Sequence, residues 1–281
     1  MAKAEKKEGN SIIETIKTVV YALLIAGVFR TLFFQPFWIP SGSMKETLLI
    51  GDFLFVNKMA YGYSYASCPS IRIASIGVDL DAQKLCGVFD GDNGRFWAGE
   101  PDRGDVVVFR HPTNGTDYIK RLVGLPGDKI QVNNGIISLN GVPVPQVPVG
   151  NFTEKQAPQG PHQLSPRCAN GPVGAGGVCE KERYQETFPE GNTHVVLNTF
   201  NQSGSPDNTK VFAVPAGHYF FMGDNRDNSN DSRVSQLSRG VGFVPYENLI
   251  GRADRIMFSS AGRSMLFFWT WRGDRFFKAV D

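Results

Sequence analysis

Hydrophobic residues follow two patterns along this chain. One long apolar run lies near the N-terminus, and the remaining sequence carries short apolar runs separated by turn residues. The short runs are rich in valine, isoleucine and phenylalanine, which suit a pleated sheet. They include residues 53–58, 105–110, 118–124 and 129–133. This pattern predicts a mainly β protein with antiparallel strands.

Turn residues add detail to this prediction. The segment NNGIISLNG, residues 133–141, has Asn-Gly at both ends, which is a strong hairpin signal. The segment VFAVPAGHYFFMGDN from Val211 supplies two more expected strands. Between them, residues 142–210 are rich in Pro, Gly, Asn and Gln, so we expect a smaller β-rich domain inserted there. We expect residues 65–101 to form a second segment that extends outside the main β unit.

The N-terminal apolar run predicts a membrane anchor. Residues 18–29 carry no charge, and apolar residues resume after Arg30, so residues 18–34 reach the lower end of the roughly 17 to 25 residues that span a bilayer. A cleaved signal peptide is the alternative, because lysines precede the run, but the small residues of a cleavage site are missing. We expect residues 1–35 to form a cytoplasmic N-terminus and one transmembrane helix, and residues 36–281 to lie outside.

Four cysteines form two sequence-local pairs, Cys68 with Cys86 and Cys168 with Cys179. Neither pair has the CxxC spacing common in zinc sites, so we expect two disulfides and no metal. Four unrelated buried thiols are the alternative, since connectivity cannot be read from sequence. Disulfides require an oxidising compartment, which agrees with an external location for residues 36–281.

The overall charge excludes one class of partner. The chain has 29 Lys plus Arg and 27 Asp plus Glu, a formal net charge of +2. This balance is too even for a nucleic-acid surface, so we expect no nucleic-acid partner.

Ser43 is the candidate nucleophile, in the sequence PSGSM directly after the anchor. Gly42 permits a tight turn that can expose the following hydroxyl, although an ordinary polar loop has the same composition. No GxSxG motif surrounds Ser43. The four histidines, His111, His162, His194 and His218, lie in positions typical of surface or structural residues.

Lys120 is the candidate general base if no histidine serves in that role. A strand would place it on one face with Tyr118 and Leu122 and turn Arg121 to the other face. An ordinary lysine is almost fully protonated at pH 7, so a catalytic lysine must be desolvated or otherwise tuned. By position alone, Lys120 could equally be a lysine of an edge strand.

Several motifs together resemble the signature boxes of bacterial signal peptidase I, in the order in which that family carries them. They are PSGSM at 40–44, RGDVVVF at 103–109, KRLVGLPGD at 120–128, GDNRDNSNDSR at 223–233 and GFVP at 242–245. The chain departs from the family pattern at Lys45-Glu46, where a proline commonly precedes Thr47, and in the longer spacer at 234–241.

The resemblance implies a Ser/Lys dyad of Ser43 and Lys120 that acts through an acyl-enzyme, with no cofactor. It implies that the backbone N–H of Ser43 and the hydroxyl of Ser41 form the oxyanion hole. It also implies roles for the acidic motif, in which Ser229 orients the Lys120 amine, Asp231 and Arg233 form a supporting ion pair, and Gly223 leaves room near the dyad. Without the resemblance, this acidic loop would suggest a calcium site, but an EF-hand register from Asp227 fails.

The expected function is therefore membrane-bound removal of N-terminal signal peptides, with cleavage after small residues of the Ala-x-Ala type. The expected partners are precursor proteins, the lipid bilayer of the bacterial cytoplasmic membrane and, by proximity, the secretion translocon. By the resemblance, the substrate would lie between residues 35–41 and 117–120. Aromatic residues within 33–38 and 267–271 could seat the domain in the lipid interface, and for those near the C-terminus ordinary core packing is the alternative. A specialised processing peptidase, such as a conjugation-pilus type, a self-cleaving regulator and a non-catalytic membrane-anchored β binding module are the alternatives.

Overall fold

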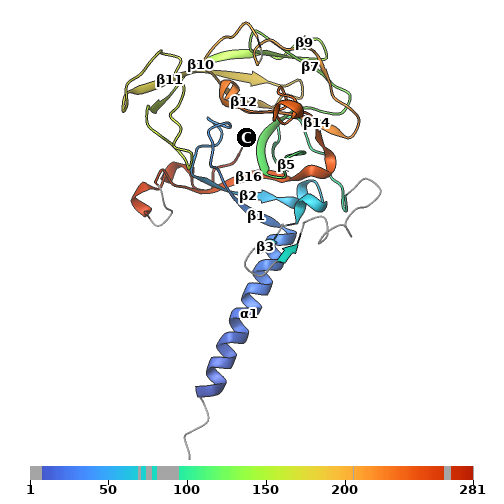
Figure 1. Ribbon diagram of the computed structural model, residues 1–281, viewed down its shortest axis with the longest axis vertical. Helices are drawn as coiled ribbons and strands as arrows, with labels where there is room; N and C mark the ends of the chain where they lie inside the picture. The colour runs from blue at the N-terminus through green and yellow to red at the C-terminus, as the bar shows by residue number, and fades with distance from the viewer. Residues whose placement is uncertain are drawn as a thin grey trace, which may run out of the picture.

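The computed structural model describes residues 8–68, 71–73, 78–80, 95–204, 206–262 and 267–280. A long helix, α1 (Glu8–Leu32), leads into the first strand and projects from a β-rich body (Figure 1). Seven short 3-10 helices lie in the described connections: η1 (Lys58–Ala60), η2 (Tyr65–Ser67), η5 (Arg226–Asn228), η6 (Gln236–Ser238), η7 (Tyr246–Asn248), η8 (Phe268–Thr270) and η9 (Gly273–Arg275).

A seven-stranded sheet forms the centre of the body. Its strand order is β1-β2-β16-β5-β6-β14-β15, and neighbouring strands are antiparallel. The strands are β1 (Phe34–Trp38), β2 (Asp52–Asn57), β5 (Val106–Arg110), β6 (Asp117–Gly124), β14 (His218–Met222), β15 (Val244–Pro245) and β16 (Leu249–Ser259).

Three smaller antiparallel sheets complete the described structure. The first has the order β13-β7-β8-β9, the second β10-β11-β12 and the third β3-β4. Their strands are β3 (Ile71–Ile73), β4 (Val78–Leu80), β7 (Lys129–Asn133), β8 (Ile136–Leu139), β9 (Val142–Pro143), β10 (Gln146–Lys155), β11 (Val178–Thr187), β12 (Thr193–Asn198) and β13 (Phe212–Ala213). The expected mainly β, antiparallel fold is confirmed. The β10-β11-β12 sheet falls within the expected insertion at 142–210, whose boundaries as a separate domain stay a prediction.

The two Asn-Gly turns adopt the conformation that their sequence predicts. Asn134 and Asn140 have φ angles of 48° and 53°, and the glycines that follow them also have positive φ. Positive φ at both central residues matches the right-handed twist of the flanking strands. The first turn joins β7 to β8, and the second joins β8 to β9.

Strand β6 connects the separate parts of the core. Leu122 packs in a cluster with Phe109 and Phe221, whereas the next residue, Val123, packs with Ile130 and other side chains of the β7-β8 hairpin. Alternate residues of a strand point to opposite faces, so this strand holds both neighbouring layers together. Burying each large apolar side chain contributes about 1.5 to 3 kcal/mol, which fixes β6 firmly in place.

The predicted membrane anchor is not confirmed. Within the part of the chain that the structure describes, no helix has both the length and the apolar character required to cross a membrane.

The disulfide prediction has two outcomes. Cys168 and Cys179 form the expected disulfide, which closes the segment that leads into β11. Cys68 is also disulfide-bonded. Its expected partner, Cys86, lies outside the described residues, so that pairing stays a prediction.

Candidate active site

The loop between β1 and β2, residues 39–51, carries Ser43 and is called the nucleophile loop below. Lys120 reaches this loop from β6, and its Nζ lies 2.6 Å from Ser43 Oγ. Its Nζ also donates a hydrogen bond to the carbonyl oxygen of Ile119 at 2.9 Å. Only 8% of Ser43 and 4% of Lys120 is exposed, so the contact is shielded from bulk water. The fold thus brings together the two residues that the sequence analysis singled out.

Burial changes the acid–base chemistry of Lys120. It lowers the pKa of the amine from 10.5 to about 8, because a charged ammonium loses its hydration in the interior. The carboxylates of Asp231 and Asp224 oppose this shift. At a pKa of about 8, roughly one molecule in ten carries a neutral lysine at pH 7, which makes Lys120 usable as a base.

The predicted ion pair between Asp231 and Arg233 is present and buried. Arg233 Nε donates to Asp231 Oδ1 at 2.9 Å, and Nη2 donates to Oδ2 at 2.8 Å. Burial by itself would raise the pKa of Asp231, but the charge and hydrogen bonds of Arg233 hold it below its ordinary value. The ionised Asp231 also accepts a hydrogen bond from the backbone of Gly223 at 3.1 Å, so the pair fixes the chain beside the dyad.

Gly223 occupies a position with no space for a side chain. A Cβ there would lie 2.3 Å from Ser229 Oγ and 2.6 Å from the carbonyl oxygen of Ser43. Because the second contact is with backbone, a side-chain rotation could not relieve it. The close approach of residues 223 and 43 therefore requires glycine, as expected.

Ser229 lies beside the dyad, but it does not make the expected hydrogen bond in this structure. Its Oγ is buried and makes no hydrogen bond to Lys120 among the described residues, but it interacts with the carboxylate of Asp231 and helps to hold the pKa of that group below its ordinary value. The Lys120 amine instead faces Ser43 Oγ and the carbonyl oxygen of Ile119. An orienting role for Ser229 thus stays a prediction.

Ser41 lies on the exposed side of the nucleophile. Its Oγ is 3.4 Å from Ser43 Oγ. An oxyanion donor must lie about 2.7 to 3.1 Å from the oxygen that becomes negative, so this distance to Ser43 Oγ leaves the oxyanion role of Ser41 a prediction.

The sequence analysis missed Asn225, which holds the backbone of the nucleophile loop through two hydrogen bonds. Its backbone N–H donates to the carbonyl oxygen of Ser43 at 3.1 Å, and its Nδ2 donates to that of Gly42 at 2.8 Å. Asn225 is fully buried, so both bonds are protected from competition by water. The only sequence signal was its place within the acidic motif.

A second missed group lies behind the loop. Arg121 donates to both carboxylate oxygens of Asp224, from Nε at 2.9 Å and from Nη2 at 2.8 Å. Thr47 of the nucleophile loop also donates to this carboxylate. The lysine motif and the acidic motif are thereby tied to the same loop through charge-assisted hydrogen bonds.

The β10-β11-β12 sheet holds the other side of the nucleophile loop. Lys45 donates to Glu154 Oε2 at 2.5 Å and to Gln159 Oε1 at 2.8 Å. Glu46 pairs with Arg183 of β11. The Lys45-Glu46 departure from the family pattern therefore forms the contact between loop and insertion.

Comparison with known proteins agrees with the motifs. The family model for signal peptidase, peptidase S26, matches residues 12–258. A signal peptidase I of Rickettsia typhi is 37% identical over 266 residues, covering 92% of this chain and 85% of that protein. A signal peptidase I of Rickettsia canadensis is 39% identical over 250 residues, covering 87% and 79%.

A solved signal peptidase I structure from Enterococcus faecalis V583 is also similar. It is 24% identical and covers 54% of this chain and 96% of that one, but its TM-score of 0.28 is too low to support an argument. The family match and the curated relatives each span most of the chain. The protein therefore belongs to the signal peptidase family, peptidase S26, and is a serine endopeptidase.

Proposed function

We propose that this protein removes N-terminal signal peptides from exported precursor proteins, with Ser43 as nucleophile and Lys120 as general base. The observation that carries the proposal is the 2.6 Å contact between Ser43 Oγ and a buried lysine amine whose pKa is about 8. A binding module would have no use for a serine next to a lysine of lowered pKa. The relatives named signal peptidase I support the substrate class.

The reaction follows from this geometry. Neutral Lys120 accepts the Ser43 proton while Oγ attacks the scissile carbonyl, and the Ser43 N–H with the Ser41 hydroxyl stabilises the oxyanion. The Lys120 ammonium then donates its proton to the leaving amine, which leaves an acyl-enzyme. Lys120 next takes a proton from water, and the resulting attack on the ester releases the signal peptide and restores Ser43.

Cleavage after small residues is part of the proposal. An extended substrate would lie between residues 35–41 and 117–120, held by main-chain pairing. Ile119 packs against the cluster that contains Ile39 and, like Phe37, against the cluster that contains Val56, so both flanking segments carry packed apolar side chains. Apolar walls packed this closely favour alanine-sized residues at the first and third positions before the scissile bond.

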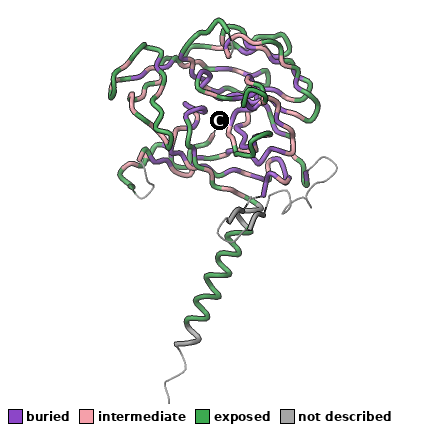
Figure 2. Tube along the Cα trace, viewed as in Figure 1, coloured by how far each residue is buried: buried purple, intermediate pink, exposed green. Residues whose placement is uncertain are grey.

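We also propose that α1 anchors the enzyme in the bacterial cytoplasmic membrane, with the β body on the outer side and close to the translocon. Most of α1 is exposed (Figure 2), and it presents apolar side chains such as Leu23 and Ile25, which are 67% and 70% exposed. The C-terminal residues Phe268 and Trp269 are 69% and 68% exposed, so they are not core residues. Exposed apolar groups of this kind suit a lipid environment.

Incubation of the purified protein with a precursor tests the proposal. The wild-type protein is expected to release the mature chain after an Ala-x-Ala sequence, with kcat/KM rising with pH to a plateau above about 8. The Ser43→Ala and Lys120→Arg variants should be inactive, since arginine cannot deprotonate usefully. Turnover by folded Lys120→Arg would remove Lys120 from the mechanism.

A further inference from the structure

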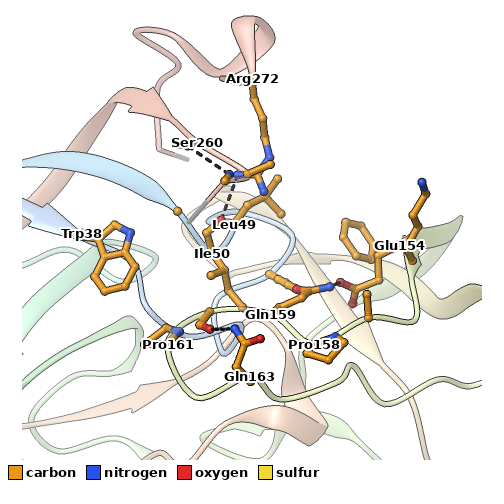
Figure 3. A pocket seen from close by; sticks show the side chains of 18 of the residues that line it. Trp38, Leu49, Ile50, Glu154, Pro158, Gln159, Pro161, Gln163, Ser260 and Arg272 are labelled. Atoms are coloured by element: carbon orange, nitrogen blue, oxygen red, sulfur yellow. Dashed lines mark hydrogen bonds and ion pairs between the residues drawn. The ribbon is translucent and has the colours of Figure 1, made fainter. Parts of the chain in front are cut away.

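A cavity of about 800 Å³ lies between the nucleophile loop, the β10 end of the insertion and the C-terminal segment (Figure 3). The nucleophile loop contributes Lys45 and Ile50, the insertion contributes Glu154 and Gln159, and the C-terminal segment contributes Arg272. The mechanism proposed above uses none of these side chains.

The cavity borders the nucleophile loop close to the reacting serine. A Cβ on Gly42 would lie 3.2 Å from Lys45 Cε, so the Lys45 side chain runs directly past the residue before Ser43. A Cβ on Gly160 would lie 2.7 Å from the carbonyl oxygen of Pro40, so the rim of the cavity touches the same loop. Lys120 reaches the same loop from β6, and Trp38 of β1 also lines the cavity.

A substrate chain must cross this loop. Its acyl half is proposed to lie between residues 35–41 and 117–120, next to Lys120. In the arrangement that we propose, the half that follows the scissile bond leaves past Lys45. An extended chain advances about 3.3 to 3.6 Å per residue, so the second or third residue after the scissile bond reaches roughly 7 to 11 Å from Ser43, where it can enter the cavity.

Lys45 and Glu154, which line the cavity, belong to a buried charged group that also contains Lys181 and has an excess of positive charge. Lys45 and Lys181 both donate to the carboxylate of Glu154, at 2.5 Å and 2.8 Å. Two cations thus share one anion, and all three side chains are at least 90% buried. One positive charge remains uncompensated within this group, where screening by water is weak.

Arg272 adds a second positive charge on the wall. It extends toward Ile50 (Figure 3), and its Nη1 donates to the carbonyl oxygen of Ile50 at 3.0 Å and to Ser259 Oγ at 2.7 Å. Its nearest carboxylate among the described residues, Asp52, is 3.9 Å away and is paired more closely with Arg275 at 2.6 Å. Arg272 therefore has charge to offer a ligand.

We propose that this cavity is a subsite for the mature part of the precursor and that it selects an acidic side chain at the second or third residue after the scissile bond. The inference rests on the proposed function and extends it to the side of the substrate that the signal peptide does not occupy. Arg272 is the specificity-determining residue, because its side chain is 27% exposed, against 5% for Lys45 and 2% for Lys181, and its nearest carboxylate is shared with Arg275. Lys155, which is exposed, also lines the cavity and adds to its positive charge. An anionic lipid headgroup is the competing occupant, which the experiment below distinguishes.

The test uses full-length protein in neutral detergent and precursor peptides that differ at one position. At the second residue after the scissile bond, and in a parallel set at the third, the peptides carry Asp, Asn or Lys. At one of the two positions, kcat/KM is expected to be about fivefold lower for the Asn peptide than for the Asp peptide, and about fivefold lower again for the Lys peptide. Each step is the size expected for gaining or losing one partly exposed charge pair. Arg272→Glu should reverse the order, so that the Lys peptide becomes the best substrate. Arg255→Glu, a charge reversal at an exposed residue outside the cavity, should keep the wild-type order.

The outcomes separate the explanations. Differences below twofold among the peptides at both positions would overturn the proposal, and so would an Arg272→Glu variant that slows all peptides equally. A different set of results would show that the cavity binds a lipid headgroup and that the proposal is wrong. In that case added anionic lipid raises wild-type activity, the Arg272→Glu variant loses this response, and the charge of the peptide has no effect. Failure of the proposed function would look different, because no peptide would then be cleaved or Ser43→Ala would still cleave them.

Discussion

Replacing Lys120 with methionine is expected to abolish cleavage and at the same time to make the folded protein more stable at pH 7. The buried amine is the reason. Burial lowers the pKa of Lys120 from 10.5 to about 8, so at pH 7 the folded protein holds a charged group that would be better hydrated in the unfolded chain. Methionine has a similar length and removes this charge without leaving a large cavity.

The size of the effect follows from the pKa shift. A shift from 10.5 to about 8 corresponds to about 3 kcal/mol at pH 7. Methionine also loses the hydrogen bonds from Nζ to Ser43 Oγ and to the carbonyl oxygen of Ile119, which contribute about 1 kcal/mol each. The net gain in the free energy of unfolding is therefore about 1 to 2 kcal/mol at pH 7.

The stability difference between the two proteins is expected to change with pH. Between pH 8 and 10.5 the unfolded chain keeps the Lys120 proton while the folded protein has lost it, so unfolding takes up a proton and wild-type stability rises with pH. The advantage of Lys120→Met should thus shrink by about 3 kcal/mol between pH 7 and pH 10.5 and become a disadvantage.

Denaturant unfolding of both proteins in the same detergent at pH 7 and pH 10.5 measures this difference. Lys129→Met, at an exposed position on β7, controls for the loss of a lysine as such. A Lys120→Met variant that is less stable than wild type at pH 7, or a difference that does not change with pH, would refute the argument that burial tunes this amine.

Three further predictions concern the surroundings of the dyad. Ser41→Ala should lower kcat about 10²- to 10³-fold with little change in KM, as shown by steady-state kinetics on a precursor, and a folded variant with wild-type kcat would exclude the oxyanion role. Gly223→Ala should cost about 1 to 3 kcal/mol in denaturant unfolding and lower kcat at least tenfold, because the new methyl group would lie 2.6 Å from the carbonyl oxygen of the nucleophile. Unchanged stability and rate would show that the backbone can move apart. Joint replacement of Cys168 and Cys179 by alanine should lower stability by about 2 to 3 kcal/mol without changing the pH profile of cleavage, and a shifted profile would show that this bridge reaches the active site.

Local sequence signals were sufficient for the strands and turns near the site. The run from Tyr118 to Gly124 was expected as a strand and lies within β6, and the Asn-Gly pairs at 134 and 140 form the expected turns. These features depend on the conformational preferences of adjacent residues, which a sequence displays directly. The motifs around Ser43 and Lys120 identified the pair through family resemblance, although 77 positions separate the two residues.

Tertiary structure alone decided how reactive that pair is and what holds it. The lowered pKa of Lys120 arises from layers of side chains packed around it, and no local pattern reports that burial. Asn225 and Glu154 both bind the nucleophile loop, from segments that lie far from it in sequence. The partners of the Lys120 amine, Ser43 Oγ and the carbonyl oxygen of Ile119, are likewise visible only in the folded chain, and the orienting role of Ser229 stays a prediction. A sequence therefore specifies which groups are present and the local shape of the chain, whereas distances, hydration and charge balance at the site depend on contacts that form only when the whole chain has folded.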